Sequence, residues 1–109
     1  MLSSPRRRFT IQEARALLPA VKEVTGEAAK AIEKIALKNN ELPPQEQEVV
    51  NRIIQTWAGK IMGLGCVPNG VWLVDFDNGD GFFCWQYGEE DLGYIHSYEA
   101  GYAGRTPLN

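Results

Sequence analysis

Residues 82–96 read FFCWQYGEEDLGYIH, and this stretch is typical of a β-hairpin. An aromatic-rich run comes first, a turn rich in glycine and acidic residues follows, and a second run contains the one histidine, His96. The pattern predicts one strand over residues 82–87 and another over residues 92–97. Side chains able to carry chemistry gather in and beside this hairpin: Asp75, Cys84, Glu89, His96 and Arg105.

Another strand is predicted immediately before the hairpin. Residues 71–76 read VWLVDF, an apolar run with the branched and aromatic side chains that strands favour. The connection DNGDG, residues 77–81, contains the Asn-Gly pair of a tight hairpin turn. Three consecutive strands with short turns form an antiparallel meander, and such a sheet is stable only when one face is covered.

The first part of the chain predicts a helical region over residues 10–38. Thr10 and Glu13 have the spacing of a capping box at a helix start. Apolar residues then recur every three or four positions, as on one face of a helix. Pro19 lies inside this region, where proline removes one backbone hydrogen bond. We therefore expect a short helix over residues 10–18, then a kink or break, with Pro19 near the first turn of a longer helix.

A second helix is predicted over residues 43–64. Pro43 and Pro44 can open it, because the first helical turn needs no N–H group from them. The short link between the two helical regions predicts an antiparallel helical hairpin. The expected fold is α+β, with this hairpin packed on the three-stranded antiparallel meander in a single domain, residues 9–109, behind a flexible basic tail, residues 1–8.

Composition and charge argue against several classes of function. The chain has 109 residues and a net charge of −3, which argues against nucleic-acid binding. No apolar run approaches the ~20 residues needed to cross a bilayer, and no secretory signal is recognisable. We therefore expect a cytoplasmic protein with no membrane or nucleic-acid partner. Its two cysteines, Cys66 and Cys84, are expected to be free thiols.

Strand alternation predicts which side chains share a face of the sheet. With the first turn centred on Gly79, Asp75 faces Phe83, and Phe83 in turn faces His96. On this register Cys84 lies on the opposite face. The shared face would also contain the aromatic residues Trp85 and Tyr94. A slip of one residue would reverse part of this grouping.

His96 is the leading candidate for a catalytic residue. A general base or ligand histidine needs an orienting partner, and Asp75 and Glu89 are the candidates for that role. The alternative is a structural histidine that bonds a carboxylate and stabilises the end of a strand. Arg105 either pairs with Glu89 and ties the C-terminal segment over the sheet, or binds a small anionic ligand.

The aromatic residues Trp85 and Tyr94 are the other expected contributors to such a ligand site. More generally, the strands and the C-terminal segment carry more aromatic side chains than one face of a small sheet needs. Exposed aromatic clusters mark interfaces or ligand pockets. We therefore expect a second partner for the sheet, most simply another copy of the chain, in a homodimer.

Cysteine and metal chemistry are weaker expectations. Cys84 lies between two aromatic residues, which favours a small buried apolar role over a reactive thiolate. A metal site could draw on His96, Cys84, Glu89 and Glu13. Structural zinc sites normally use four cysteine or histidine ligands at recognisable spacing, and this chain lacks that pattern. Glu13 is already explained by the capping box, and we expect no metal and no cofactor.

Two functional hypotheses follow from these residues. The first is a non-catalytic binding or homo-oligomeric assembly module that uses the aromatic face of the sheet or the helices. The alternative is a small ligand-binding or metal-dependent hydrolase-like enzyme centred on His96, with Asp75 or Glu89 as its orienting residue and Arg105 holding an anion.

Several short motifs together resemble a small bacterial and archaeal family catalogued as a domain of unknown function. They are FTIQEA at 9–14 with Leu18-Pro19, LVDF at 73–76, CWQYGE at 84–89, His96, and GYAGRTPL at 101–108. The resemblance implies a stand-alone cytoplasmic domain and supplies no activity, substrate or catalytic residue. It marks seven positions of the family pattern: Glu13, Asp75, Cys84, Trp85, Glu89, His96 and Arg105. One departure is visible, because Trp72 and Asp77 flank LVDF where the family commonly has glycine and proline.

Overall fold

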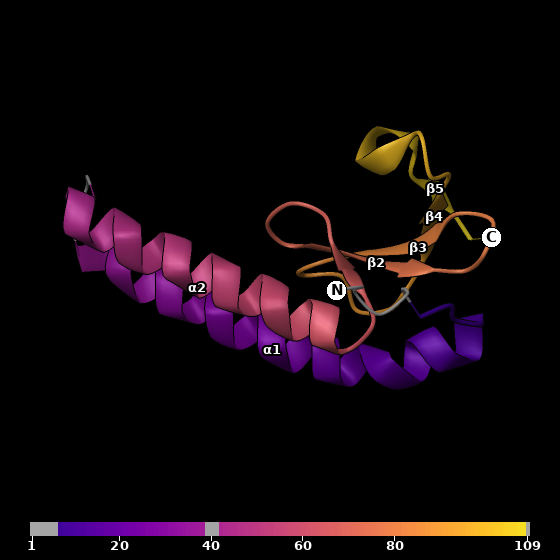
Figure 1. The fold of residues 1–109 in the computed structure, drawn as a ribbon, viewed down its shortest axis with the longest axis horizontal. Helices are drawn as coiled ribbons and strands as arrows, with labels where there is room; N and C mark the ends of the chain where they lie inside the picture. The colour runs from indigo at the N-terminus through magenta and orange to yellow at the C-terminus, as the bar shows by residue number, and fades with distance from the viewer. Residues whose placement is uncertain (1–6, 39–41, 109) are drawn as a thin grey trace, which may run out of the picture.

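The computed structural model describes residues 7–38 and 42–108, and it has two helices and one five-stranded antiparallel sheet (Figure 1). The strands follow one another in sequence order across the sheet. The elements are α1 Ile11–Lys38, α2 Pro44–Gly63, β1 Val67–Pro68, β2 Leu73–Asp77, β3 Phe82–Gln86, β4 Tyr94–His96, the 3₁₀ helix η1 Gly101–Gly104, and β5 Thr106–Pro107. The predicted α+β class is confirmed, whereas the predicted number of three strands is wrong.

The two additional strands lie at the edges of the sheet and are each two residues long. β1 pairs with β2 through Val67 and Asp75, and β5 pairs with β4 through Pro107 and Tyr94. Each contains a proline, which is tolerated at a sheet edge because its nitrogen has no hydrogen to donate. Hydrophobic alternation cannot reveal a two-residue strand, so the sequence predicted neither of these strands.

Helix α1 begins at the predicted capping box. The Thr10 amide donates to Glu13 Oε1 at 2.8 Å, and the Glu13 amide donates to Thr10 Oγ1 at 3.1 Å. The backbone bond to Thr10 is the main reason that the pKa of Glu13 lies below its ordinary value. The expected break at Pro19 is wrong, because α1 continues through it as one helix of 28 residues. Pro19 is exposed, while Leu18 and Val21 beside it are buried and hold the helix against the core.

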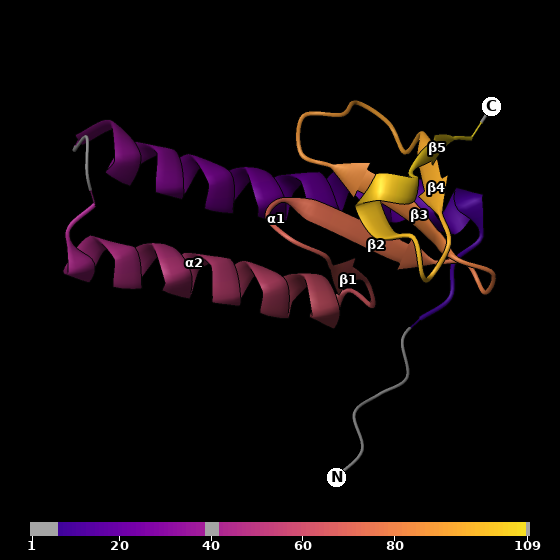
Figure 2. The same cartoon turned by 90° about the horizontal axis from the view of Figure 1, so that it is seen from above.

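The helices lie side by side and antiparallel, and one end of the hairpin supports the sheet (Figures 1 and 2). The other end of the hairpin extends past the sheet. The core lies between the supported end and the near face of the sheet. It contains Ala14, Leu18 and Val21 of α1, Trp57 and Ile61 of α2, and Val74, Phe76, Phe83 and Trp85 of the sheet. None of the described helices is long and apolar enough to cross a membrane.

The strand register differs from the expected one by one residue. Asp75 pairs with Cys84, and Phe82 pairs with His96. The turn between β2 and β3 is therefore centred between Gly79 and Asp80 and not on Gly79. Two side chains build this turn: Asp77 Oδ1 accepts from the Gly79 amide at 2.9 Å, and Asn78 Oδ1 accepts from the amides of Asp80 and Gly81 at 2.9 Å.

This register reverses part of the predicted grouping of side chains. Phe83 and Trp85 face the helices and belong to the core. Asp75, Cys84 and His96 occupy the opposite face of the sheet, which alternation assigns to every second residue. The expectation that Cys84 lies away from Asp75 and His96 is therefore wrong, as is the expectation that Trp85 shares a face with Tyr94.

Candidate functional site

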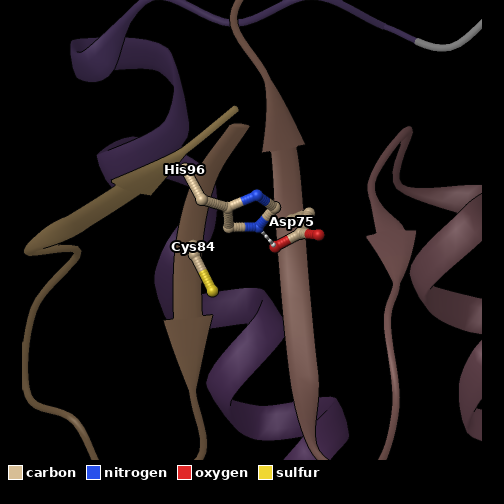
Figure 3. A group of neighbouring side chains, drawn as sticks. All are labelled: Asp75, Cys84 and His96. Carbon is tan, nitrogen blue, oxygen red and sulfur yellow. Dashed lines mark hydrogen bonds and ion pairs between the residues drawn. The ribbon is translucent and has the colours of Figure 1, made fainter. Parts of the chain in front are cut away.

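Three neighbouring strands bring Asp75, Cys84 and His96 together on the face of the sheet that points away from the helices (Figure 3). One ligand atom of each residue lies within 4.8 Å of the others. The three residues are 1%, 1% and 5% exposed, respectively. We call these residues the sheet cluster. It joins a carboxylate, a thiol and an imidazole in an environment with almost no solvent.

His96 is held by hydrogen bonds at both ring nitrogens. Nδ1 lies 2.8 Å from the carbonyl oxygen of Ser97, and Nε2 lies 3.0 Å from Asp75 Oδ1. The carbonyl oxygen can only accept, so Nδ1 carries a hydrogen. The second oxygen of Asp75, Oδ2, accepts from Asn69 Nδ2 at 2.9 Å. Asp75 therefore has the position of an orienting partner for His96, and Glu89 does not.

The contact between His96 Nε2 and Asp75 Oδ1 needs a shared hydrogen. An unprotonated ring nitrogen and a carboxylate oxygen both carry lone pairs and would repel each other at 3.0 Å. A proton between Nε2 and Oδ1 removes this repulsion and makes a buried, charge-assisted hydrogen bond. Both ring nitrogens are thus engaged inside the fold, which favours a structural or ion-holding histidine over a general base for an external substrate.

Cys84 is also poorly suited to nucleophilic chemistry. Burial raises the pKa of its thiol to about 12, and the neighbouring Asp75 carboxylate acts in the same direction. Arg105 opposes this effect without overcoming it. A thiol is nucleophilic only as a thiolate, so Cys84 stays neutral and unreactive at physiological pH. The sequence-based preference for a buried, inert Cys84 agrees with this environment.

Arg105 and Glu89 form an ion pair beside the sheet cluster. Arg105 Nη2 donates to Glu89 Oε1 at 2.7 Å and Oε2 at 2.9 Å, and it lies 3.3 Å from the Cys84 carbonyl oxygen. Its guanidinium carbon lies 3.9 Å from the centre of the Tyr94 ring. Burial lowers the pKa of Arg105, but the interactions with Glu89 and Cys84 together outweigh burial and raise the pKa above its ordinary value. This geometry matches the predicted tie of the C-terminal segment to the sheet.

Two tyrosines of the C-terminal segment lie over the face of the sheet that points away from the helices. The Tyr98 hydroxyl donates to Asp77 Oδ1 at 2.7 Å, and the Tyr102 hydroxyl donates to Gln86 Oε1 at 3.1 Å. The C-terminal segment thus forms a third layer, opposite the helices (Figure 1). Trp85 lies in the core on the other side, so it cannot share a ligand site with Tyr94 and Arg105.

The predicted metal ligands divide between the sheet cluster and other places. His96 and Cys84 belong to the cluster, whereas Glu89 pairs with Arg105 and Glu13 caps α1. Asp75 was expected to orient His96 and was missing from the predicted metal ligands. The correct strand register would have revealed it, because Asp75 is directly opposite Cys84.

A small cavity borders His96 at the end of the sheet. Its volume is about 350 Å³. It is lined by Asn78, Asp80, Gly81, Ile95, His96, Ser97, Ala100, Gly104 and Thr106. Gly81 is needed for the close approach of its strand to the next one, because a Cβ atom there would lie 2.5 Å from the His96 carbonyl oxygen.

A larger cavity lies between the two helices, along the middle of the hairpin. Its volume is about 390 Å³. We call it the hairpin groove, and it is lined by Val24, Glu27 and Ala28 of α1 and by Val49, Arg52, Ile53, Thr56, Trp57 and Lys60 of α2. Its floor is apolar and its rim is charged, which is the composition of a protein interface.

Comparison with known families matches residues 7–108 to the family described as "Uncharacterized conserved protein (DUF2203)". The match covers nearly the whole chain, and the protein belongs to this family. The sequence-based resemblance to a family of unknown function is thereby confirmed. No curated protein and no solved structure matches the chain.

Proposed function

We propose that this member of the DUF2203 family is a homodimeric assembly module, in which the helical hairpins of two copies pack together as a four-helix bundle. The hairpin groove carries the proposal, because it leaves an apolar surface uncovered in a single copy. A cytoplasmic setting is part of the proposal and is supported by the two free thiols, Cys66 and Cys84.

The uneven burial of α2 supports this arrangement. Its buried residues are Trp57 and Ile61, both in the half that lies near the sheet. In the other half, Val49 is 39% exposed and Ile53 is only partly buried. Two helices alone bury one stripe each and cannot enclose a core. A second hairpin would supply the missing layer.

The charges around the hairpin groove are self-complementary. Glu27 lies on the α1 side, and Arg52 and Lys60 lie on the α2 side. In a two-fold dimer the same surface of each copy meets its counterpart, so α1 of one copy can pack against α2 of the second copy. Glu27 would then face basic residues, which favours this pairing and its orientation.

The available surface is near the size that a stable dimer needs. A 20-residue helix is about 30 Å long, and two adjacent helices are about 20 Å wide, which makes a face of roughly 600 Å². Stable interfaces bury about 800 Å² on each partner, and side chains at the edges can supply the difference. The sheet face is less suitable, because Tyr98 and Tyr102 already bond Asp77 and Gln86 within the chain.

The test is the mass of the protein in solution. Analytical ultracentrifugation at high micromolar concentration should give a dimer for the wild type. Val49→Glu should give a monomer, because it places a carboxylate in the apolar floor of the groove. Val49 is already 39% exposed, so the monomer is expected to stay folded.

Met62→Glu is the matched control. Met62 is an apolar residue of the same helix, is 59% exposed and does not line the groove. This variant should remain dimeric. A monomeric wild type at high micromolar concentration, or a dimer unaffected by Val49→Glu, would reject the proposal.

A further inference from the structure

We propose that Asp75, Cys84 and His96 form a binding site for one thiophilic divalent transition-metal ion of the Zn²⁺ class. The three residues come from adjacent strands, and one ligand atom of each lies within 4.8 Å of the others. All three are buried in a part of the sheet where charge must be compensated locally. The site is separate from the hairpin groove and does not depend on the dimer.

The hydrogen bonds of His96 favour metal binding through Nε2. Metal-bound histidines usually donate their other ring N–H to a carbonyl or carboxylate, which fixes the tautomer and the ring orientation. Here Nδ1 donates to the Ser97 carbonyl oxygen at 2.8 Å. Nε2 and Asp75 Oδ1 lie 3.0 Å apart and share a proton, and a metal ion that replaces this proton would be held by the lone pairs of both atoms.

Asp75 is supported in the same way. Its Oδ2 accepts from Asn69 Nδ2 at 2.9 Å, which leaves Oδ1 directed toward His96. The Asn69 backbone amide is itself bonded to the Leu73 carbonyl oxygen at 2.9 Å, so the Asn69 position is defined by the start of β2. Such outer hydrogen bonds orient ligating carboxylates.

The donor set selects the class of metal. Imidazole nitrogen and thiolate sulfur suit zinc and its neighbours, whereas Mg²⁺ and Ca²⁺ prefer oxygen ligands alone. Ligands on a tetrahedral Zn²⁺ ion lie about 3.3–3.6 Å apart. The present spacing of up to 4.8 Å therefore requires an inward shift of about 1 Å by one side chain. A cavity of about 350 Å³ borders His96, one of the three proposed ligands.

Charge balance supports the exchange of protons for an ion. Without metal, the sheet cluster holds a neutral thiol and a His96–Asp75 pair that shares one extra proton, and its net charge is zero. Binding of M²⁺ releases the thiol proton and the shared proton, which leaves one thiolate, one carboxylate, a neutral imidazole and the ion. The net charge is again zero, so two protons are replaced without burying additional charge.

The test uses Co²⁺ as a spectroscopic probe on the full chain after treatment with a chelator. Titration should give one Co²⁺ per chain, with a near-ultraviolet thiolate-to-cobalt charge-transfer band that disappears when Zn²⁺ is added. Cys84→Ser should lose this band. Cys66→Ser is the matched control, since Cys66 is also a buried free thiol but lies outside the cluster, and it should keep the band.

Asn69→Ala provides a second variant that keeps all three ligands. Asn69 is exposed, so this variant is expected to fold, and its affinity for Co²⁺ should fall by about 10-fold or more. Absence of a thiolate band in the wild type would overturn the proposal. It would also be overturned if the band survived in Cys84→Ser or vanished in Cys66→Ser. The monomeric Val49→Glu variant should bind Co²⁺ as the wild type does, so failure of the dimer proposal leaves this one intact.

Discussion

At the scale of single residues, Cys66 and Cys84 determine how the fold responds to alkaline pH. Burial is the main cause that raises the pKa of each thiol from 9.0 to about 12. The folded protein therefore keeps both thiols neutral at a pH where the unfolded chain ionises them. The contribution of the two neutral thiols to the free energy of unfolding is complete below about pH 9. It is lost as the pH rises from about 9 toward 12.

We predict that the free energy of unfolding of the metal-free protein falls over this range by up to about 1.4 kcal/mol per pH unit for each thiol. Urea denaturation at pH 8 and pH 10.5 measures this loss. In Cys66→Ala the loss should be smaller, because only Cys84 still contributes. An identical pH dependence in both proteins would contradict the prediction.

At the scale of secondary-structure elements, one buried hydrogen bond joins the two helices. Trp57 Nε1 donates to Thr25 Oγ1 at 2.8 Å, and the two residues are 2% and 0% exposed. The edge-on contact of Trp57 with Trp72, whose ring centres are 4.9 Å apart, extends this contact toward the sheet. This bond explains why the polar residue Thr25 lies in the otherwise apolar stripe of α1.

We predict that Thr25→Val destabilises the protein by about 1–3 kcal/mol, because it keeps the shape of the side chain but leaves the indole N–H without its acceptor. Urea denaturation measures the effect. Thr106→Val serves as the control, since Thr106 is an exposed threonine outside the helices whose hydroxyl makes only a 3.5 Å contact with the Ile95 carbonyl oxygen, and it should change the free energy of unfolding by less than about 0.5 kcal/mol. Equal effects of the two substitutions would argue against a stabilising role for the bond.

At the scale of the whole molecule, the sheet lies between the helices and the C-terminal segment (Figures 1 and 2). The core side is apolar, whereas the other side contains the sheet cluster under a cover of Tyr98, Tyr102 and Arg105. The C-terminal segment is thus the layer that keeps water from the buried imidazole, carboxylate and thiol.

We predict that deletion of residues 98–109 makes Cys84 accessible while Cys66 remains protected. Arg105 and β5 would be absent, which removes the ion pair with Glu89 and the pairing partner of β4. Maleimide labelling followed by mass spectrometry of the peptides measures each thiol separately. Protection of Cys66 serves as the internal control for a folded core, and equal protection of both thiols would contradict the prediction.

Local sequence patterns were enough to predict the secondary-structure elements and the family. The Thr10–Glu13 capping box and the recurring apolar residues predicted the helical hairpin, and apolar and aromatic-rich runs between turn residues predicted the three longer strands. These signals depend on residues that are near one another in the chain, so they can be recognised without a structure. The pairing of Glu89 with Arg105 was one of the two roles predicted for Arg105, because opposite charges beside the same sheet attract each other.

The contacts between side chains of different elements depend on the tertiary fold and could not be predicted from local patterns. The one-residue difference in register was determined by side-chain bonds of Asp77 and Asn78 in the turn, and it placed Cys84 opposite Asp75. Pro19 stayed within α1, because buried neighbours hold the helix on both sides. The edge strands and the hairpin groove likewise depend on packing between distant segments. Local periodicity shows which face a residue occupies within its own helix or strand. The register between strands, and the meeting of side chains from different strands, depend on long-range contacts.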